Sequence, residues 1–397
     1  MTTAGLGEIY YDPFDVDIDV DPHPLWKRMR DEAPLYRNDK YGFWALSRFA
    51  DVESAIVDWD TYRSGHGTVL NLVLAGVKYP PGMFIFEDPP VHDVHRSILT
   101  RVFTVRKMNA LETQVRELCR RTLDSLTGTT GFDLIVDLGM ELPIRVIGML
   151  LGISEQGQDA IRGRVDNAGF GHGTDADGEI EASYRQMFSD FIDLRAENPA
   201  DDVLTELLYT EFEDQSGVRR RLSREEVLGF VLLLAGAGGD TTRQLIGWLG
   251  KLLAEHPDQR RAVAADRSLI TNTIEETLRY EAPSPVQTRV LARDVDVYGQ
   301  TLPKGSVVVL LNGAANRDER RFPDADRFDV HRTISRHLSF GHGIHFCMGA
   351  ALARLEGRVV LDELLNRFPE WDVDLDNAVQ AHTPTTRGWL RLPLVVN

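Results

Sequence analysis

The stretch FGHGIHFCMG, from Phe340 to Gly349, places a single cysteine in a loop with three glycines and two histidines. Glycine costs backbone entropy, so a cluster of glycines indicates sharp turns or the close approach of a flat group. A helix is expected to begin at about Met348, and its first N–H groups and positive dipole end would then point at the sulfur of Cys347. That arrangement favours a thiolate, so the stretch predicts a functional cysteine at a helix start.

A zinc site fits this loop poorly. Zinc usually takes four ligands, two or more of them thiolates, whereas only His342 and His345 lie near Cys347 in the sequence. The spacing of His345 and Cys347 is also unfavourable for chelation. A single thiolate shielded by glycine backbone suits instead one iron atom whose four in-plane ligands come from a porphyrin.

Composition and charge predict a globular, cytoplasmic protein. The chain has 397 residues, 43% of them apolar, and carries 44 Lys and Arg against 61 Asp and Glu, a net charge of −17. Such a surface repels nucleic acid and anionic membranes. The longest apolar stretch, Val227 to Gly239, is shorter than the roughly 20 residues of a membrane span. The two cysteines, Cys119 and Cys347, form no disulfide framework and fit a reducing compartment.

Helical periodicity dominates the chain, as in TQVRELCRRTLDSL (113–126) and LEGRVVLDELLNRF (355–368). Strand patterns cluster in two places, at 42–48 and at 288–311, where alternating residues are separated by turn formers. The chain shows neither an internal repeat nor a low-complexity linker. We therefore expect one domain over residues 1–397, mainly α with a smaller β portion.

The stretch 222–258 reads as one long helix, because Ser223 and Glu226 form a capping box and Pro257 marks its end. Glycines in its middle each cost a helix roughly 1 kcal/mol relative to alanine. They are followed directly by Asp240 and Thr241. One interpretation is a kinked buried helix whose threonine bonds back to a carbonyl, and the other is a site that needs an acid beside an alcohol.

Two further pairs have an ordinary and a functional interpretation. Glu276 and Arg279 are spaced i,i+3 on one helix, whereas Glu275 and Arg279 at i,i+4 would be a common surface pair. His92 and Arg96 lie one helical turn apart. They are either two exposed residues or the cationic partners that carboxylates of a bound group require.

The spacing Phe340-Gly341-x-Gly343-x-His345-x-Cys347-x-Gly349 resembles the haem-binding signature of the cytochrome P-450 family. The match is complete at every fixed position. The resemblance implies that Cys347 is the axial ligand to the iron of haem b and that Phe340 packs beside it. It also implies that Gly349 lets the following helix approach the ring.

The resemblance assigns roles to the other motifs, and it runs from about Pro22 to the C-terminus. Ala237-Gly238-Gly239-Asp240-Thr241 resembles the distal helix that crosses the haem face, where glycine makes room for dioxygen. Asp240 and Thr241 would deliver protons. The implied propionate partners are His92, Arg96, Arg289 and His345, and the implied structural lock is Glu276, Arg279 and Arg327.

The activity implied is that of a haem-thiolate monooxygenase, with haem between the distal helix and the cysteine loop. Electrons would come from NAD(P)H through a ferredoxin reductase and a ferredoxin, since no flavin or iron–sulfur domain is seen fused to the chain. The alternative is a haem-binding sensor or carrier without turnover, which would not need Asp240 and Thr241. We expect a monomer.

The substrate implied is a small hydrophobic molecule, and a basic surface is expected to receive the ferredoxin. An alternative for these basic residues is pairing with nearby acids such as Glu356 and Asp362. The expected pocket lining is 69–86, the region about Phe170, 235–241, 284–287 and 383–389, and the expected basic surface is Arg101, Arg106, Lys107, Arg354 and Arg358.

Overall fold

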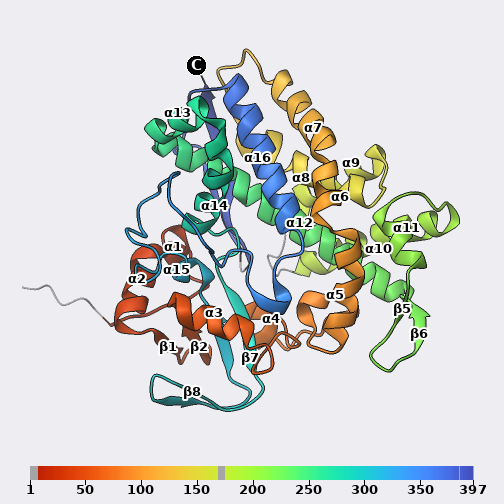
Figure 1. The fold of residues 1–397 in the computed structure, drawn as a ribbon, viewed down its shortest axis with the longest axis vertical. Coiled ribbons are helices and arrows are strands. Elements are labelled where there is room, and N and C mark those ends of the chain that lie inside the picture. The colour runs from red at the N-terminus through yellow and green to blue at the C-terminus, as the bar shows by residue number, and fades with distance from the viewer. Residues whose placement is uncertain (1–7, 169–174, 384, 397) are drawn as a thin grey trace, which may run out of the picture.

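The computed structural model describes residues 8–168, 175–383 and 385–396. Most of the helices gather in one part of the molecule and the largest sheet lies in another (Figure 1). The predicted mainly helical architecture with a smaller β portion is confirmed. The helices are α1 (Val16–Val20), α2 (His23–Glu32), α3 (Phe49–Val57), α4 (Leu70–Leu74), α5 (Val91–Val102), α6 (Val105–Ala110), α7 (Glu112–Ser125), α8 (Glu141–Leu150), α9 (Glu155–Ala168), α10 (Asp175–Glu197), α11 (Val203–Tyr209), α12 (Arg224–Glu255), α13 (Pro257–Ala265), α14 (Ile270–Tyr280), α15 (Asn312–Ala315) and α16 (Ala350–Arg367).

The largest sheet has five strands in the order β1-β2-β10-β7-β3. Strand β10 runs parallel to β2 and antiparallel to β7, so the two predicted strand regions, 42–48 and 288–311, meet in one sheet. The strands are β1 (Leu35–Asn38), β2 (Phe43–Leu46), β3 (Tyr62–Arg63), β4 (Gly131–Asp133), β5 (Glu211–Glu213), β6 (Arg219–Arg221), β7 (Gln287–Leu291), β8 (Val295–Val297), β9 (Gln300–Leu302), β10 (Val307–Leu310), β11 (Trp371–Val373), β12 (Val379–His382), β13 (Arg387–Arg391) and β14 (Pro393–Val396).

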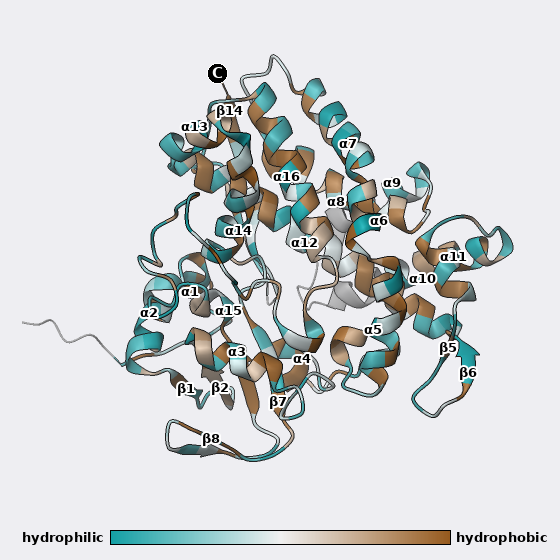
Figure 2. Ribbon diagram, in the orientation of Figure 1, coloured by the Kyte–Doolittle hydropathy of each residue, from teal (hydrophilic) through white to brown (hydrophobic). Residues whose placement is uncertain are grey.

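Helix α12 runs through the middle of the helical part and begins at the predicted capping box. The Ser223 hydroxyl accepts from the Glu226 N–H, and the Glu226 carboxylate accepts from the Ser223 N–H. Buried side chains such as Phe230 and Leu249 pack it into the core, and many residues of α12, α8 and α16 are apolar (Figure 2). Burying one such side chain stabilises the fold by roughly 1.5–3 kcal/mol, which offsets the cost of the glycines. In the described ranges, neither α12 nor any other helix is apolar over the length needed to cross a bilayer.

The N-terminal segment is tied to the last part of the chain. His382 Nδ1 lies 2.8 Å from Asp19 Oδ2, and Arg387 donates to the carbonyl oxygens of Asp19 and Val20. These bonds hold α1 against the hairpin of β12 and β13. The connection between β12 and β13 also reaches the middle of α12, as described below.

Candidate active site

The cysteine loop turns back on itself through two glycines. Gly341 and Gly343 have φ values of 67° and 70°, a left-handed conformation that favours glycine. The Cys347 N–H donates to the Phe340 carbonyl at 2.8 Å and closes the loop. Helix α16 begins at Ala350 with Gly349 as its N-cap, two residues later than predicted. The cysteine therefore stands directly before the helix start.

The thiol of Cys347 is crowded by protein on several sides although the residue is not closed off from solvent. The residue keeps accessible surface, yet burial raises the pKa of its thiol above the ordinary value. The N–H groups of Gly349 and Ala350 and the charges of Arg96 and Arg354 lower this pKa without overcoming the burial. The helix start therefore acts on the pKa in the expected direction, toward the thiolate, while burial outweighs it. A bound metal cation would supply what is missing, because a coordinating thiol is deprotonated outright.

Donor groups from three separate segments converge near the cysteine loop. The rings of His92 and His345 lie 4.3 Å apart between centroids, and the Nε2 atom of each is buried without a hydrogen-bond partner in the described structure. Arg96 donates to the Phe346 carbonyl at 2.7 Å. Arg289 donates to the Thr288 carbonyl and to the Gln287 side chain. His92 is fully buried, so the interpretation of His92 and Arg96 as two exposed residues is wrong.

The two arginines of this cluster lack a counter-charge, whereas His92 Nδ1 lies 2.9 Å from Asp93 Oδ1. Within the described ranges neither Arg96 nor Arg289 has a carboxylate at ion-pair distance. Burial lowers the pKa of Arg289 to about 10. Burial, reinforced by repulsion from Arg289, His92 and Arg96, lowers the pKa of His345 to about 2. Buried charges are normally paired, so the cluster requires an anion. The two propionates of haem b fit this requirement, and Cys347 would be the ligand of its iron.

Asp240 and Thr241 lie in the middle of α12 but are not bonded to each other. The Thr241 hydroxyl donates to the Ala237 carbonyl at 2.8 Å, which is the back-bond that the ordinary interpretation of this helix expected. Asp240 is buried. Its Oδ1 accepts from Arg243 and, at 3.4 Å, from Gln244, and its Oδ2 accepts from the hydroxyl of Thr386.

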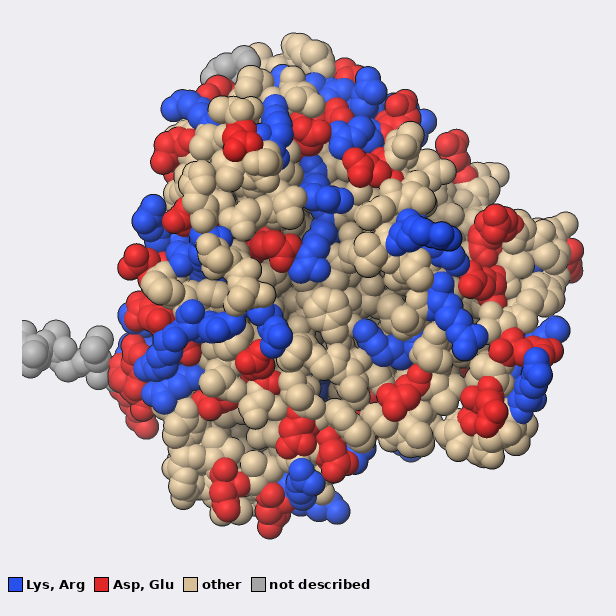
Figure 3. Space-filling model, viewed as in Figure 1, with Lys and Arg blue, Asp and Glu red and all other residues tan. Residues whose placement is uncertain are grey.

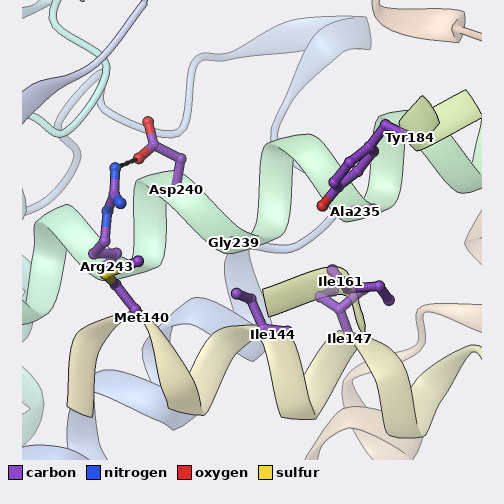
Figure 4. A pocket seen from close by; sticks show the side chains of 9 residues that line it. All are labelled: Met140, Ile144, Ile147, Ile161, Tyr184, Ala235, Gly239, Asp240 and Arg243. Atoms are coloured by element: carbon purple, nitrogen blue, oxygen red, sulfur yellow. Dashed lines mark hydrogen bonds and ion pairs between the residues drawn. The ribbon is translucent and has the colours of Figure 1, made fainter. Parts of the chain in front are cut away.

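A small apolar cavity borders the same stretch of α12, between it and α8 (Figure 4). A Cβ atom on Gly238 would lie 2.8 Å from Ile147 Cδ1, so a side chain at this position would push the end of Ile147 aside. At Gly239 a Cβ atom would meet nothing within 4 Å. The cavity is lined by Met140, Ile144, Ile147, Ile161, Tyr184, Ala235, Gly239, Asp240 and Arg243.

A second cavity, of about 610 Å³ and open to solvent, lies under the N-terminal segment. It brings together the predicted lining segments 284–287 and 383–389 with Leu70 of α4. Aromatic side chains that the sequence did not suggest, among them Phe14 and Trp26, complete it. The predicted contribution from Phe170 lies outside the described residues.

The structural lock on α14 uses a different arginine from the one predicted. Arg279 forms two bonds to Glu276, at 2.7 and 2.8 Å, and both side chains are fully buried. The third member is Arg332, whose Nε lies 3.1 Å from Glu276 Oε1. The side chain of Arg327 is 68% exposed and points toward Asp329. Only its carbonyl takes part, as an acceptor for Arg279 and Arg332, so the assignment of Arg327 is wrong.

The acids around the predicted basic surface do not have the expected ion-pair partners in the described structure. Glu275 pairs with Arg354 and not with Arg279. Glu356 is buried with an unpartnered oxygen, and Asp362 pairs with Arg116. Arg101, Arg106 and Arg358 have no ion pair in the described structure, and Lys107 binds Glu206.

Sequence reasoning missed Arg332, Arg243 and Thr386. Arg332 follows Arg327 by five positions in an irregular segment, where spacing does not show which side chain turns inward. Arg243 is spaced i,i+3 from Asp240 on α12, a signal that could have been used. Thr386 lies 146 positions from its partner Asp240, and no local pattern connects them.

Comparison with known proteins decides the family. A family model described as cytochrome P450 matches residues 177–393, more than half of the chain. The chain belongs to the cytochrome P450 family. It is 37% identical over 402 residues to a putative cytochrome P450 123 of Mycobacterium tuberculosis, covering 99% of this chain and 98% of the relative. It is 36% identical over 406 residues to a vitamin D(3) 25-hydroxylase of Pseudonocardia autotrophica, covering 100% and 98%.

The fold agrees with this assignment. The solved structure of cytochrome P450 CYP109Q5 from Chondromyces apiculatus has a TM-score of 0.86 and 32% identity, covering 98% of each chain. The predicted P450 fold and cofactor class are thereby confirmed: proteins of this family bind haem b through a thiolate ligand. The cytochrome P450 described here is an enzyme of a family with characterised monooxygenases, and this argues against a sensor or carrier.

Proposed function

We propose that this cytochrome P450 is a monooxygenase that oxidises a hydrophobic small molecule, using dioxygen and electrons that reach it from NAD(P)H through a ferredoxin reductase and a ferredoxin. It would act in the cytoplasm as a monomer of one domain, residues 1–397. The observation that carries the proposal is the donor cluster beside Cys347, in which Arg96 and Arg289 have no ion pair in the described structure and Nε2 of His92 and of His345 is buried without a partner. When bound there, haem supplies the activation of dioxygen.

The chain's own residues would hold the cofactor and handle protons. Cys347 would bind the iron, with Phe340 beside it and Gly349 at the start of α16. Arg96 and Arg289 would neutralise the propionates. Asp240 and Thr241, neighbours on α12, would together deliver protons to the face of this helix that carries Ala237.

The substrate class is supported by the walls of the two cavities. Isoleucine, methionine and tyrosine line the cavity between α12 and α8. Aromatic and aliphatic side chains such as Phe14, Leu70 and Val286 line the cavity under the N-terminal segment. Predominantly apolar walls with few polar groups favour a hydrophobic ligand. The names of two similar proteins also mention organic small molecules. One is a vitamin D(3) 25-hydroxylase, and the other is a mutant of P450 EryK in complex with erythromycin B.

The electron donor is supported by the charge distribution. Lys and Arg side chains gather over α5, α6 and the start of α16 on the face seen in Figure 3, although the whole molecule carries −17. Arg101 of α5 and Arg106 of α6 have no ion pair in the described structure. Ferredoxins are generally acidic, so this surface is the natural place for one to dock.

The proposal is tested by substrate-dependent turnover. A compound library is screened for ligands that shift the haem absorbance, and each hit is then incubated with NAD(P)H and a surrogate ferredoxin system. We expect substrate-dependent NAD(P)H consumption with an oxygenated product. Thr241→Ala should bind the same ligand equally well but divert reducing equivalents into peroxide, and Thr241→Ser should restore product. Ligands that bind without any NAD(P)H consumption would contradict the proposal.

A further inference from the structure

The buried carboxyl group of Asp240 needs a source of protons if it is to be used in every turnover. Its hydrogen-bond partners within the described structure are Arg243, Gln244 and Thr386. Arginine stays protonated in proteins and a glutamine amide is not an acid at ordinary pH. The hydroxyl of Thr386 is therefore the one partner among these three that can pass a proton to the carboxylate.

Three threonine side chains form a chain of contacts that ends at Asp240. Thr386 Oγ1 donates to Asp240 Oδ2 at 2.5 Å, Thr383 Oγ1 lies 2.9 Å from Thr386 Oγ1, and Thr385 Oγ1 lies 3.4 Å from Thr383 Oγ1. A hydroxyl has one hydrogen. The Thr383 hydroxyl donates to the Thr386 carbonyl oxygen at 2.9 Å and accepts from the Thr385 and Thr386 N–H groups. Of the three hydroxyls, the one whose O–H bond points toward Asp240 is therefore that of Thr386.

The chain runs from solvent to the interior. Asp240 and Thr386 are buried, Thr383 is half-buried and Thr385 is exposed. All three threonines line the cavity of about 610 Å³ under the N-terminal segment. Its rim carries Asp15, so its outer end is polar and accessible to water, and the longest gap in the chain is at this wet end.

We propose that Thr386 relays protons from this cavity to Asp240, a role that rests on the function proposed above. The Thr386 O–H bond breaks as an O–H bond forms on Asp240 Oδ2. Thr386 Oγ1 takes a proton from water in the cavity that it lines, and that water regains a proton from bulk solvent. One proton enters in total, and no residue is oxidised or reduced. Thr386 acts through Asp240, as a positioning and relay residue.

A purely mechanical role for Thr386 is the competing explanation, since its bond also ties the segment before β13 to α12. Other bonds already do this. Gln244 Oε1 accepts from the Trp389 N–H at 2.6 Å, and Trp248 Nε1 donates to the Arg387 carbonyl at 3.0 Å. Replacing threonine by valine at position 386 keeps the shape of the side chain and leaves both of these contacts, so the variant isolates the hydroxyl.

The experiment compares Thr386→Val, Thr386→Ser and Thr277→Val holoenzyme. Thr277 is a buried threonine of α14 whose hydroxyl has no partner in the described structure, so it is a matched control. We expect Thr386→Val to turn over at least about tenfold more slowly, within the range of a lost proton-transfer group, with a larger solvent deuterium isotope effect. Serine should restore both values, and the control should match wild type.

A readout without turnover separates this proposal from the function itself. The infrared carboxylate band of Asp240, assigned through Asp240→Asn, should shift in Thr386→Val and stay in place in Thr386→Ser. An unchanged band, an unchanged isotope effect, or a serine variant as impaired as the valine variant would each overturn the relay. If wild type shows no substrate-dependent NAD(P)H consumption, the proposed function fails, and the infrared comparison still decides whether the hydroxyl binds the carboxylate.

Discussion

Arg289 is a buried cation without an ion-pair partner in the described structure. It is 3% exposed, and burial lowers its pKa only to about 10, so it remains charged at neutral pH. An unpaired buried charge destabilises a fold. A negatively charged group bound beside Arg289 would offset this destabilisation. The neighbouring side chains of His92, His345 and Arg96 also favour a bound anion.

Replacing Arg289 by methionine should loosen haem. Losing a charge-assisted hydrogen bond costs about 1.5–3 kcal/mol, so haem should transfer to an acceptor protein roughly 10- to 100-fold faster. The haem-free variant should be at least as stable as haem-free wild type, because an unpaired charge has been removed. Arg293→Met is the control, since Arg293 is 59% exposed near the same strand. Equal transfer rates for wild type and Arg289→Met would contradict the propionate assignment.

At the scale of elements, Arg332 joins the segment after β10 to α14 through Glu276. We expect Arg332→Ala to lower the free energy of unfolding by about 1.5–3 kcal/mol, because it removes a charge-assisted bond to a fully buried carboxylate. Arg327→Ala should change it by no more than about 0.5 kcal/mol, as for other exposed positions. Denaturant unfolding of both variants gives the comparison. A larger loss for Arg327→Ala would restore the assignment made from the sequence.

Helix α16 carries a buried acid, Glu356, one of whose oxygens has no partner in the described part of the chain. Glu356 is 1% exposed, and burial raises its pKa to about 8 from an ordinary value of 4.5. A carboxyl group with a raised folded pKa contributes stability below its unfolded pKa and loses it as pH rises through the folded value. Stability from this residue is therefore present below about pH 4.5 and is gone above about pH 8.

Glu356→Gln should remove this pH dependence. The pKa difference corresponds to about 5 kcal/mol at most, so the variant should gain stability over wild type as pH rises from 5 to 9. Denaturant unfolding at several pH values measures the gap. Parallel stability curves for wild type and variant would show that Glu356 is not buried neutral. Glu363→Gln, on the same helix but already paired with Arg116, should not produce this gain.

The sequence predicted the helices and strands well because periodicity and capping are local. The capping box at Ser223, the two strand regions and the glycine loop around Cys347 all depend on neighbours within a few positions. The partners of Asp240 and Glu276 do not. Thr386 and Arg332 reach them across long stretches of chain, and the raised pKa of the Cys347 thiol depends on burial, which no spacing rule contains.

For the whole molecule, a net charge of −17 opposes the approach of an acidic ferredoxin, so docking needs a local basic surface. Arg106→Glu should slow reduction by ferredoxin and weaken its dependence on ionic strength, while substrate affinity stays the same. Lys304→Glu makes the same change of charge in the connection between β9 and β10. It should leave the rate of reduction by ferredoxin and the ionic-strength dependence of that rate nearly unchanged. Stopped-flow reduction at several salt concentrations measures the effect. Equal salt slopes for Arg106→Glu and wild type would place the docking site elsewhere.

The central claim is that Cys347 binds the iron of haem b. The chain offers one other thiol, Cys119, which is buried in α7 with its pKa raised by burial to about 12. The most direct test is the absorbance spectrum of the ferrous–CO complex in wild type, Cys347→Ser and Cys119→Ser. We expect wild type and Cys119→Ser to show the shifted band of thiolate ligation, and Cys347→Ser to lack it. A band that survives in Cys347→Ser and disappears in Cys119→Ser would contradict the claim.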